Sequence, residues 1–495
     1  MSNQQSTGRH LVWFRTDLRV HDNPALYHAM TTAQSQAQQV LAVYFVTPEQ
    51  WRQHGLGERK IRLMQNAVHN LKQALAERGV ELLVLHAGTF NHSLQLLQQL
   101  VLELDIRHIS FNNEYEVNEC KRDILCYRWA NIHQVNVHRF HDQCLIPPGA
   151  VLTKTNLPFK VYSPFRKAWL AQAERQLSAP LPSPAALQQP SSTTSTTWQQ
   201  ILTEPLRRAL TLTDQCPDAR WFDDESSAHH ALHNFLQQQG RHYHQRRDFP
   251  ALDATSQLST ALSLGLLSPR QCLFAASQAN QGLLAGGNAG LDSWINELTW
   301  REFYRHLLVA CPDLCKHQAF KPETERVKWR DAEADFQAWC DGRTGYPIVD
   351  AAQQQLLTTG WMHNRLRMVS AMFLSKHLLI DWRRGEAFFN QYLVDADLAS
   401  NNGGWQWSAS TGADGVPYFR IFNPTTQSQR FDADGQFLIR YLPQLTSLPA
   451  TSRHQPNAFE RQQTGYPDAI VDHAFARQRA LNAFKALKQE NPTDE

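Results

Sequence analysis

The stretch LSAPLPSPAALQQPSSTTSTT, residues 177–197, separates two parts of the chain that carry different hydrophobic patterns. Its proline, serine and threonine content sustains neither a helical nor a strand period, which is typical of a linker or an exposed crossover. The chain has 495 residues, and a single core stops growing at roughly 250–300 residues. We therefore expect two domains joined by a connecting segment.

Short apolar runs alternate with helical patterns from His10 to about His141. The strand-like runs are HLVWF, VLAVYFV, ELLVLHA, HISF and VNVHRF. In HDNPAL, Asp22 or Asn23 can cap a helix with Pro24 in its first turn. Alternation of strands and helices predicts a doubly wound parallel sheet covered on both faces. We assign this α/β domain to residues 1–141.

The pattern becomes almost wholly helical beyond about residue 225. LSPRQC offers Ser268 as an N-cap with Pro269 at the first helical position. We expect a linker over residues 142–225 and a large all-α domain over residues 226–495.

Composition describes a soluble globular chain, with 42% hydrophobic residues and a net charge of +2. The charge balance does not indicate a nucleic-acid binder, so any basic surface must be local. No apolar run approaches the roughly 20 residues that span a bilayer, and the start of the chain does not resemble a secretory signal. We expect a cytoplasmic protein without a membrane partner.

Common cofactor and metal motifs are missing from the sequence. No GxGxxG follows the first strand and no GxxxxGK[ST] occurs, so the usual nucleotide sites are not supported. The eight cysteines form no CxxC pair, and only CPDLCKH groups Cys311, Cys315 and His317. Without a second ligand cluster, core or pocket-wall cysteines are favoured over zinc, and no metal is expected.

Aromatic and charged residues share one stripe of the expected helix WINELTWREFYRHL, at Trp294, Glu297, Arg301 and Tyr304. A second mixed stripe, in GWMHNRLRMVSAMFL, carries Asn364, Arg367, Met368 and Ala371. Each stripe either faces solvent or lines a polar cavity, because buried charges need partners. With the aspartates, asparagines and glycines of DADLASNNGGWQW (residues 395–407), the stripes suggest a cavity for a planar cofactor with polar edges.

Three further groups of residues can be interpreted in two ways, as ordinary structural residues or as parts of a functional site. Eight of the 14 tryptophans fall between residues 294 and 407, which by itself favours an aromatic core. Thr255, Ser256 and Ser259 precede helical sequence and form either ordinary caps or a phosphate site. Several basic residues could meet phosphates, although more than half of such a set is usually solvated or paired: Arg247, Arg301, Lys316, Lys328, Arg365, Arg367, Arg383, Arg384 and Arg420.

Nine motifs, in order along nearly the whole chain, resemble the photolyase/cryptochrome flavoproteins. They are LVWFRTDLRVHDNPAL, YEVNE, RDFPALDATSQLS, LSPRQC, WINELTWREFYRHLL, GRTGYPIVDAAQQQL, GWMHNRLRM, DADLASNNGGWQWSASTGADG and PYFRIFNPTTQ. The resemblance is closest to class I cyclobutane pyrimidine dimer photolyases of the bacterial folate type. It implies an antenna domain, a helical FAD-binding domain, and blue-light-driven repair of the dimer by electron transfer from excited reduced FAD, a carbon–carbon lyase reaction.

The resemblance also implies which residues surround FAD. Asp397 would accept from the ring imide, Asp395 and Arg367 would form a pair beside the flavin, and the Asn401 amide would face flavin N5. The full set of matching positions is Tyr243, Thr255, Ser256, Leu258, Ser259, Trp294, Arg301, Arg367, Asp395, Asp397 and Asn401. Gln257 departs from the family, which frequently has arginine there.

The partner implied is ultraviolet-damaged DNA, bound by a monomer. The pocket for the flipped-out dimer would consist of Glu297, Trp300, Asn364, Met368 and Trp407, with Arg247, Arg365 and Arg420 on the DNA backbone. Electrons would reach the photoexcited flavin through Trp405, Trp382 and Trp329, while Trp339 and Trp361 would be core. A 5,10-methenyltetrahydrofolate antenna would contact Asn118, Glu119, Cys315 and Lys316, although the loop QHGLGERK (residues 53–60) differs from family forms.

Three other functions are weighed against dimer repair. A signalling cryptochrome, the main alternative, usually departs at Asn401 and at the Trp300/Trp407 pair. A six-four photolyase carries two histidines where this chain has Asn364 and Met368. A non-photochemical flavin oxidoreductase would need a nicotinamide fingerprint.

Overall fold

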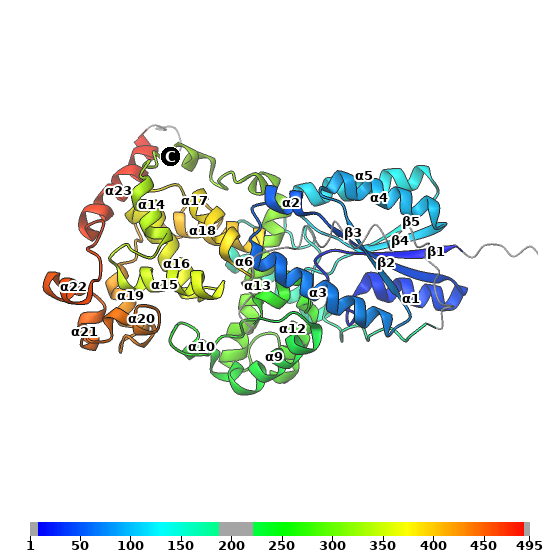
Figure 1. The fold of residues 1–495 in the computed structure, drawn as a ribbon, viewed down its shortest axis with the longest axis horizontal. Coiled ribbons are helices and arrows are strands. Elements are labelled where there is room, and N and C mark those ends of the chain that lie inside the picture. The colour runs from blue at the N-terminus through cyan, green and yellow to red at the C-terminus, as the bar shows by residue number, and fades with distance from the viewer. Residues whose placement is uncertain (1–7, 188–220, 490–495) are drawn as a thin grey trace, which may run out of the picture.

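The computed structural model describes residues 8–187 and 221–489. Its amino-terminal part is a five-stranded parallel sheet covered by helices, and its carboxy-terminal part is helical (Figure 1). Among the described residues 221–489 no strand occurs. The predicted α/β plus all-α architecture is confirmed.

The five predicted strands are all present, in the order β3-β2-β1-β4-β5. They are β1 (Arg9–Phe14), β2 (Gln39–Val46), β3 (Glu81–His86), β4 (Ile106–Asn112) and β5 (Asn136–Phe140). The helices of this part are α1 (Pro24–Gln36), α2 (Pro48–Gln53), α3 (Glu58–Ala76), α4 (Phe90–Glu103), α5 (Val117–Ile132) and α6 (Tyr162–Gln176).

Alternating side chains of the strands feed two separate cores. On one face Val12 of β1 shares a core with Leu26 of α1 and Leu71 of α3. On the other, Leu11 shares a core with α4 and α5. Successive residues of a strand point to opposite faces, so this division follows directly from the apolar runs.

The helical part is built from short helices with recognisable start signals. Ser268 caps α12 in a capping box with Gln271, as the sequence predicts, and Asn23 caps α1 by accepting from the amide of Leu26. The larger helices are α9 (Glu225–Gln238), α12 (Pro269–Ala279), α13 (Ala289–Ala310), α14 (Glu333–Cys340), α15 (Pro347–Thr359), α16 (Asn364–Met372), α17 (Trp382–Tyr392), α18 (Leu398–Ala409), α19 (Pro424–Phe431) and α23 (His473–Gln489).

Shorter helical segments connect these helices. The α-helices are α10 (Tyr243–Arg246), α11 (Ser259–Leu264), α20 (Gln436–Tyr441), α21 (Ala450–Arg453) and α22 (Ala458–Thr464). The 3₁₀ turns are η1 (Gly240–His242), η2 (Pro312–Lys316), η3 (Pro322–Arg326) and η5 (Pro443–Leu445), and η4 (Phe373–His377) is a π-helical turn after α16.

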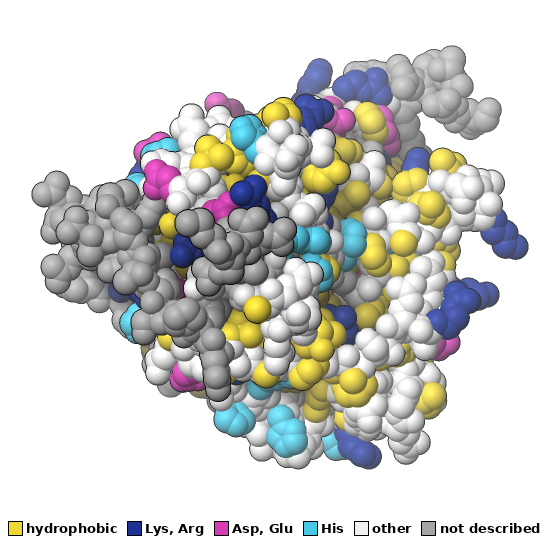
Figure 2. All heavy atoms as spheres, turned by 90° about the vertical axis from the view of Figure 1, so that its right-hand side faces the viewer, with side chains coloured by type: hydrophobic (Ala, Val, Ile, Leu, Met, Phe, Trp, Pro, Cys, Tyr) yellow, Lys and Arg dark blue, Asp and Glu magenta, His cyan; other side chains and the backbone are white. Residues whose placement is uncertain are grey.

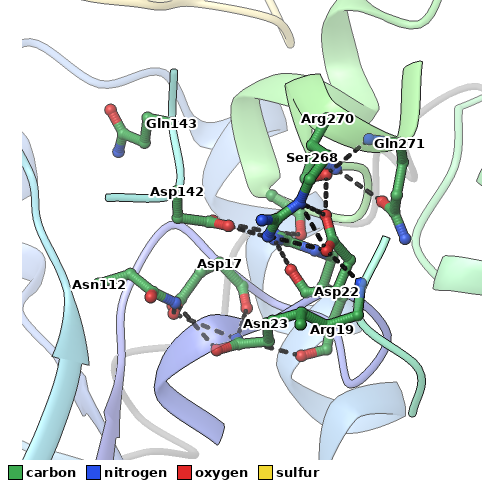
Figure 3. Close-up of polar contacts among 12 residues, drawn as sticks. Asp17, Arg19, Asp22, Asn23, Asn112, Asp142, Gln143, Ser268, Arg270 and Gln271 are labelled. Carbon is green, nitrogen blue, oxygen red and sulfur yellow. Dashed lines mark hydrogen bonds and ion pairs between the residues drawn. The ribbon is translucent and has the colours of Figure 1, made fainter. Parts of the chain in front are cut away.

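A buried polar network joins the two parts (Figure 3). Asp22 accepts from Arg270 Nε at 2.9 Å, from Ser268 Oγ and from the backbone amide of Leu181. Arg19 donates to Asp142 and to the carbonyl of Gly265, both at 3.0 Å. Buried charges are tolerated only when they are paired, so this network fixes how the sheet meets α11 and α12.

The segment 142–225, expected to be a linker, contains more structure than a plain connection. Helix α6 packs against α13. Residues 188–220, which include the serine- and threonine-rich end of the stretch 177–197, lie outside the described residues. None of the helices in the described ranges is both long enough and apolar enough for a bilayer crossing.

Candidate functional site

A cavity of about 460 Å³, here called the helical cavity, lies between α13, α16 and α18. The mixed stripe of α13 and that of α16 both line it, as the sequence predicts. Ten of the eleven residues expected around FAD line it, the exception being Thr255, and so do Glu297, Trp300, Asn364, Met368, Trp407 and Arg247 from the substrate set. Residues as far apart in the sequence as Tyr243 and Trp407 therefore converge on one cavity.

Two glycines set how closely α18 approaches this cavity. A Cβ added to Gly403 would come within 2.2 Å of the Tyr304 ring, so α18 packs on α13 at a distance that only glycine allows. A Cβ on Gly404 would meet nothing within 4 Å among the described residues, and Gly404 lines the cavity. The first glycine serves helix packing, and the second leaves room for a ligand.

Asp395 and Arg367 form a pair at the cavity wall. Arg367 Nη2 lies 2.8 Å from Asp395 Oδ2, and Arg367 Nε donates to the carbonyl of Met362 at 2.8 Å. The Asp395 side chain is 2% exposed, and its Oδ1 has no hydrogen-bond partner within the described residues. A buried carboxylate oxygen without a donor is costly, so a ligand that donates a hydrogen bond here is favoured.

Asp397 has a different environment. Its carboxylate pairs with Arg305 of α13 and accepts the amide of Ser400 at 2.9 Å, which caps α18. Burial alone would raise the pKa of Asp397, but Arg305 and Arg301 outweigh it and hold the pKa below its usual range. Asp397 is therefore ionised whenever the protein is folded near neutral pH.

Trp300 is held at the cavity by a partner that the sequence analysis missed. Its ring stacks on Tyr162 of α6, with centroids 3.5 Å apart and planes 7° from parallel. The Tyr162 hydroxyl donates a hydrogen bond to Asn296 Oδ1 at 2.6 Å, which fixes the position of the Tyr162 ring in the stack. Trp407 lines the same cavity from α18.

The predicted DNA-contacting arginines lie in three different settings. Arg247 pairs with Glu297, which is itself a predicted dimer contact. Arg365 lies 2.8 Å from Asp248 and over the Phe431 ring at 4.6 Å, and Arg420 is exposed. Neither Arg365 nor Arg420 lines the helical cavity.

The three tryptophans expected to carry electrons share one aromatic core. Trp405 and Trp382 are buried in it, and Trp329 packs against it while remaining half-buried. Trp339, expected to be plain core, contacts Trp405 edge-on with ring centroids 6.0 Å apart. The indole nitrogens of Trp405 and Trp329 are buried without partners in the described part of the chain.

A second cavity of about 610 Å³, here called the interdomain cavity, lies between the sheet and the helical part. All four residues expected to contact an antenna, Asn118, Glu119, Cys315 and Lys316, line it. The differing loop QHGLGERK contributes His54, whose Nε2 lies 3.0 Å from Asn118 Nδ2, and Lys60, which donates to the carbonyl of Ala396. The five residues Leu262, Ser263, Ala396, Asp397 and Asn401 line both cavities.

Glu119 gives the interdomain cavity an unusual carboxyl. Burial, followed by the charges of Glu116 and Glu114, raises the pKa of Glu119 to about 8. Its Oε2 is buried and has no partner among residues 8–187 and 221–489. This cavity also has a polar atom left for a ligand.

The cysteines of CPDLCKH occupy separate surroundings. Cys315 lines the interdomain cavity, while His317 Nδ1 lies 2.8 Å from Glu386. In the described residues, Cys311, Cys315 and His317 do not come together as three metal ligands. Cys315 thus lies at a cavity wall.

Two family models match this chain. Residues 10–185 match the model described as DNA photolyase, and residues 294–486 match the FAD binding domain of DNA photolyase. The chain belongs to the photolyase/cryptochrome family. The deoxyribodipyrimidine photo-lyase of Escherichia coli strain K12 is 44% identical over 97% of this chain and 99% of that protein. The protein of the same name from Vibrio cholerae is 40% identical over the same shares.

Solved structures of other family members share the fold. A bacterial class III photolyase from Agrobacterium tumefaciens is 34% identical, with a TM-score of 0.83, over 99% of this chain and 100% of that one. A cryptochrome from Synechocystis is 26% identical, with a TM-score of 0.85, over 96% and 99%. A photolyase and a cryptochrome thus both occur among its structural relatives.

The family's FAD fits the helical cavity of this photolyase homologue. The unpartnered Asp395 Oδ1, the open position at Gly404 and the polar, aromatic lining provide the acceptors and space that a flavin needs. The chain therefore binds FAD in its helical part. The individual contacts remain expectations from the family pattern.

Four residues that shape these sites were not predicted from the sequence: Arg305, Tyr162, Lys60 and His54. Arg305 had a detectable signal, because it follows Arg301 by four residues and extends the α13 stripe. Lys60 and His54 reach the interdomain cavity, and Tyr162 reaches the Trp300 ring, only through long-range packing, of which the sequence offers no local sign.

Proposed function

We propose that this photolyase homologue repairs cyclobutane pyrimidine dimers in ultraviolet-damaged DNA, using blue light. When bound and reduced, FAD supplies light absorption and the electron that splits the dimer. The observation that carries the proposal is a single cavity lined both by Asp395, Arg367 and Asn401 and by Trp300 and Trp407. The groups expected to bind cofactor and substrate then line one cavity.

FAD would be held mainly by charged side chains whose positions are already fixed by ion pairs within the protein. The Arg367–Asp395 pair would present Asp395 Oδ1 as an acceptor, and Asp397 would stay ionised beside Arg305. Asn401 Nδ2 donates a hydrogen bond to the carbonyl of Glu386 at 3.0 Å. This orientation of the amide would leave its Oδ1 to accept a hydrogen bond from the flavin. An acceptor suits a reduced flavin, which carries a proton at N5.

The dimer would enter between aromatic rings at the cavity. Trp300, backed by Tyr162, provides a rigid flat surface, and Trp407 faces the cavity from α18. Glu297 and Asn364 would read the polar edges of the pyrimidines. Enzymes that act on a base within a duplex, photolyases among them, take that base out of the stack.

The arginines would hold the DNA backbone around this opening. Exposed Arg420 and the partly exposed Arg365 and Arg247 would contact phosphates, so binding should weaken as salt rises. Trp405, Trp382 and Trp329 would carry electrons from the surface toward the helical cavity. We further propose a cytoplasmic monomer of class I, divided into residues 1–141, 142–225 and 226–495.

The interdomain cavity would hold a 5,10-methenyltetrahydrofolate antenna. Its volume of about 610 Å³, the buried Glu119 Oε2 and the polar side chain of Asn118 suit a flat ligand with hydrogen-bond donors. The five residues shared with the helical cavity would place antenna and flavin close together. A photolyase from Sulfolobus tokodaii, 25% identical with a TM-score of 0.78, is described with two FAD molecules, so flavin is the competing occupant.

Binding followed by light release tests the function. FAD-loaded, reduced protein would be mixed in the dark with labelled duplexes that contain either one thymine dimer or intact thymines. We expect at least about tenfold tighter binding to the damaged duplex, and loss of that preference after blue light as the dimer is repaired. Equal affinity for both duplexes, or a preference unchanged by light, would instead support a cryptochrome-type receptor.

A further inference from the structure

Four histidines converge at the amino ends of the strands, away from both cavities. His10 lies on β1, His108 on β4, His138 on β5 and His28 on the facing helix α1. Figure 2 views this side of the molecule, where histidine side chains gather near the middle of the face. None of the four histidines lines the helical cavity or the interdomain cavity.

The four imidazole rings are close enough to act together. The ring centroids of His28 and His138 lie 4.4 Å apart, and His10 lies 5.2 Å from His108 and 5.7 Å from both His28 and His138. One ring nitrogen from each of His10, His28 and His138 lies within 4.8 Å of the others. His108 is not one of these three, but its Nδ1 lies 3.2 Å from His138 Nε2, so its ring adjoins the group.

One nitrogen of this group is buried and unused. His10 is fully buried, its Nε2 lies 2.7 Å from Ser110 Oγ, and its Nδ1 has no partner among the described residues. A hydrogen bond at one ring nitrogen fixes the orientation of a histidine that ligates through the other. The same Ser110 Oγ also lies 3.4 Å from His28 Nδ1. The other three rings are half-buried, so an ion can reach the group from solvent.

Protonation of this group is suppressed. Burial, followed by His108, His138 and His28, lowers the pKa of His10 to about 3, and burial with His28 and His108 lowers that of His138 to about 4. Burial also lowers the pKa values of His28 and His108. All four rings are thus neutral near pH 7, which is the form that binds metals.

We propose that His10, His28 and His138, with His108 beside them, form a binding site for a divalent metal ion that prefers imidazole, such as Zn²⁺. This departs from the expectation of no metal. Zinc–nitrogen bonds of about 2.0–2.1 Å place tetrahedral ligand atoms about 3.4 Å apart. Since the ring nitrogens lie within 4.8 Å of one another, they must draw together by up to about 1.4 Å on binding. The bound ion would connect α1 to β1 and β5 at this end of the sheet.

A second group of possible ligands, His21, Glu225 and His229, provides an internal comparison. Glu225 already accepts the backbone amides of Val20 and His21, at 2.9 and 3.0 Å. Gln271 Nε2 lies 3.0 Å from His21 Nδ1 and 3.2 Å from His229 Nε2. Because its polar atoms are engaged, this group is the control site.

Calorimetric titration of the full-length, FAD-loaded protein with ZnCl₂ tests the proposal. The protein would carry no histidine tag and would first be treated with a chelator. We expect one ion per chain with micromolar or tighter affinity. His28→Gln and His138→Gln should each weaken binding at least about tenfold, and Ser110→Ala by about tenfold, whereas His229→Gln should not change it.

Cobalt spectra provide a readout that does not depend on the variants folding. Co²⁺ added to the wild-type protein should give visible absorption bands typical of nitrogen ligation, and Zn²⁺ should remove them. Retained flavin absorbance would verify that each variant is folded. The proposal is overturned if no stoichiometric binding occurs, if the cobalt bands are absent, or if His229→Gln rather than His28→Gln abolishes binding.

Discussion

At the scale of single residues, flavin binding in the helical cavity depends on a carboxylate of which only one oxygen has a partner within the protein. Asp395 Oδ2 meets Arg367, while Oδ1 is buried without a partner among the described residues. The role we give it predicts that Asp395→Asn weakens FAD binding by about 1–3 kcal/mol, because the amide loses the charge and presents a donor where an acceptor is needed. Flavin released from purified protein after denaturation, measured against protein concentration, reports the loss.

Asp248→Asn is the matched control. Asp248 pairs with Arg365 at the same 2.8 Å distance but does not line the helical cavity. This variant should keep its flavin. Equal flavin content in both variants would contradict the role of Asp395.

Glu119 predicts a pH dependence of stability in the antenna-free protein. Burial and the neighbouring Glu116 and Glu114 raise its folded-state pKa from 4.5 to about 8. The folded protein thus holds this proton more tightly than the unfolded chain does, so stability falls as the pH rises from about 4.5 through about 8. Glu119→Gln removes that loss of stability. The unfolding temperature of the variant, relative to that of the wild type, should therefore increase between about pH 6 and about pH 8.

The exposed Glu323→Gln variant controls for the general effect of removing a carboxylate. Its unfolding temperature relative to wild type should stay constant over the same pH interval. A gain of the same size in both variants would contradict the buried, protonated state of Glu119.

Individual residues could be predicted where sequence spacing encodes a shared face. The stripe from Trp294 to Tyr304 was predictable because a helix places residues three and four apart together. The stack of Tyr162 on Trp300 was not, because it joins residues 138 positions apart and depends on where α6 docks. The four-histidine group was also missed, since its members lie on three separate strands and on helix α1.

At the scale of elements, α18 depends on two adjacent glycines with opposite roles. Gly403→Ala would push a methyl group into the Tyr304 ring, and we expect a loss of about 1–3 kcal/mol in stability. Gly404→Ala has free space and should stabilise the helix by up to about 1 kcal/mol. Its methyl group enters the helical cavity, however, so FAD binding should weaken.

Thermal unfolding of the FAD-free proteins, together with their flavin affinity, separates these effects. Gly403→Ala should lower the unfolding temperature, and Gly404→Ala should lower flavin affinity without that destabilisation. The reverse pattern would show that the cavity is not where FAD binds.

Most elements were predictable, because local signals and the fold agree. The five strands were apparent from apolar runs, and the caps at Asn23 and Ser268 from residue chemistry. Helix α6 was absorbed into the expected linker 142–225, since the proline-rich residues that follow it dominate the composition there.

At the scale of the whole molecule, an aromatic core connects the helical cavity with the half-buried Trp329. If Trp329, Trp382 and Trp405 carry electrons inward, Trp329→Phe should slow photoreduction of oxidised flavin at least about tenfold. Phenylalanine is much harder to oxidise, while its packing is similar. Repair by protein reduced beforehand should be largely unchanged. Transient absorption and a repair assay measure the two rates.

Trp361→Phe is the control for this route, because Trp361 packs on Trp221 outside that core, with ring centroids 6.1 Å apart. It should leave photoreduction unchanged. An equal loss of photoreduction and repair in Trp329→Phe would contradict the electron route.

The central claim is that the helical cavity brings flavin and a pyrimidine dimer together for light-driven repair. Chromatography of an oligonucleotide with one thymine dimer, after incubation with reduced protein, measures the restored thymines directly. We predict restoration of the intact bases under blue light and none in the dark. Equal amounts of intact thymine in light and dark, from protein that retains its reduced FAD, would contradict the account.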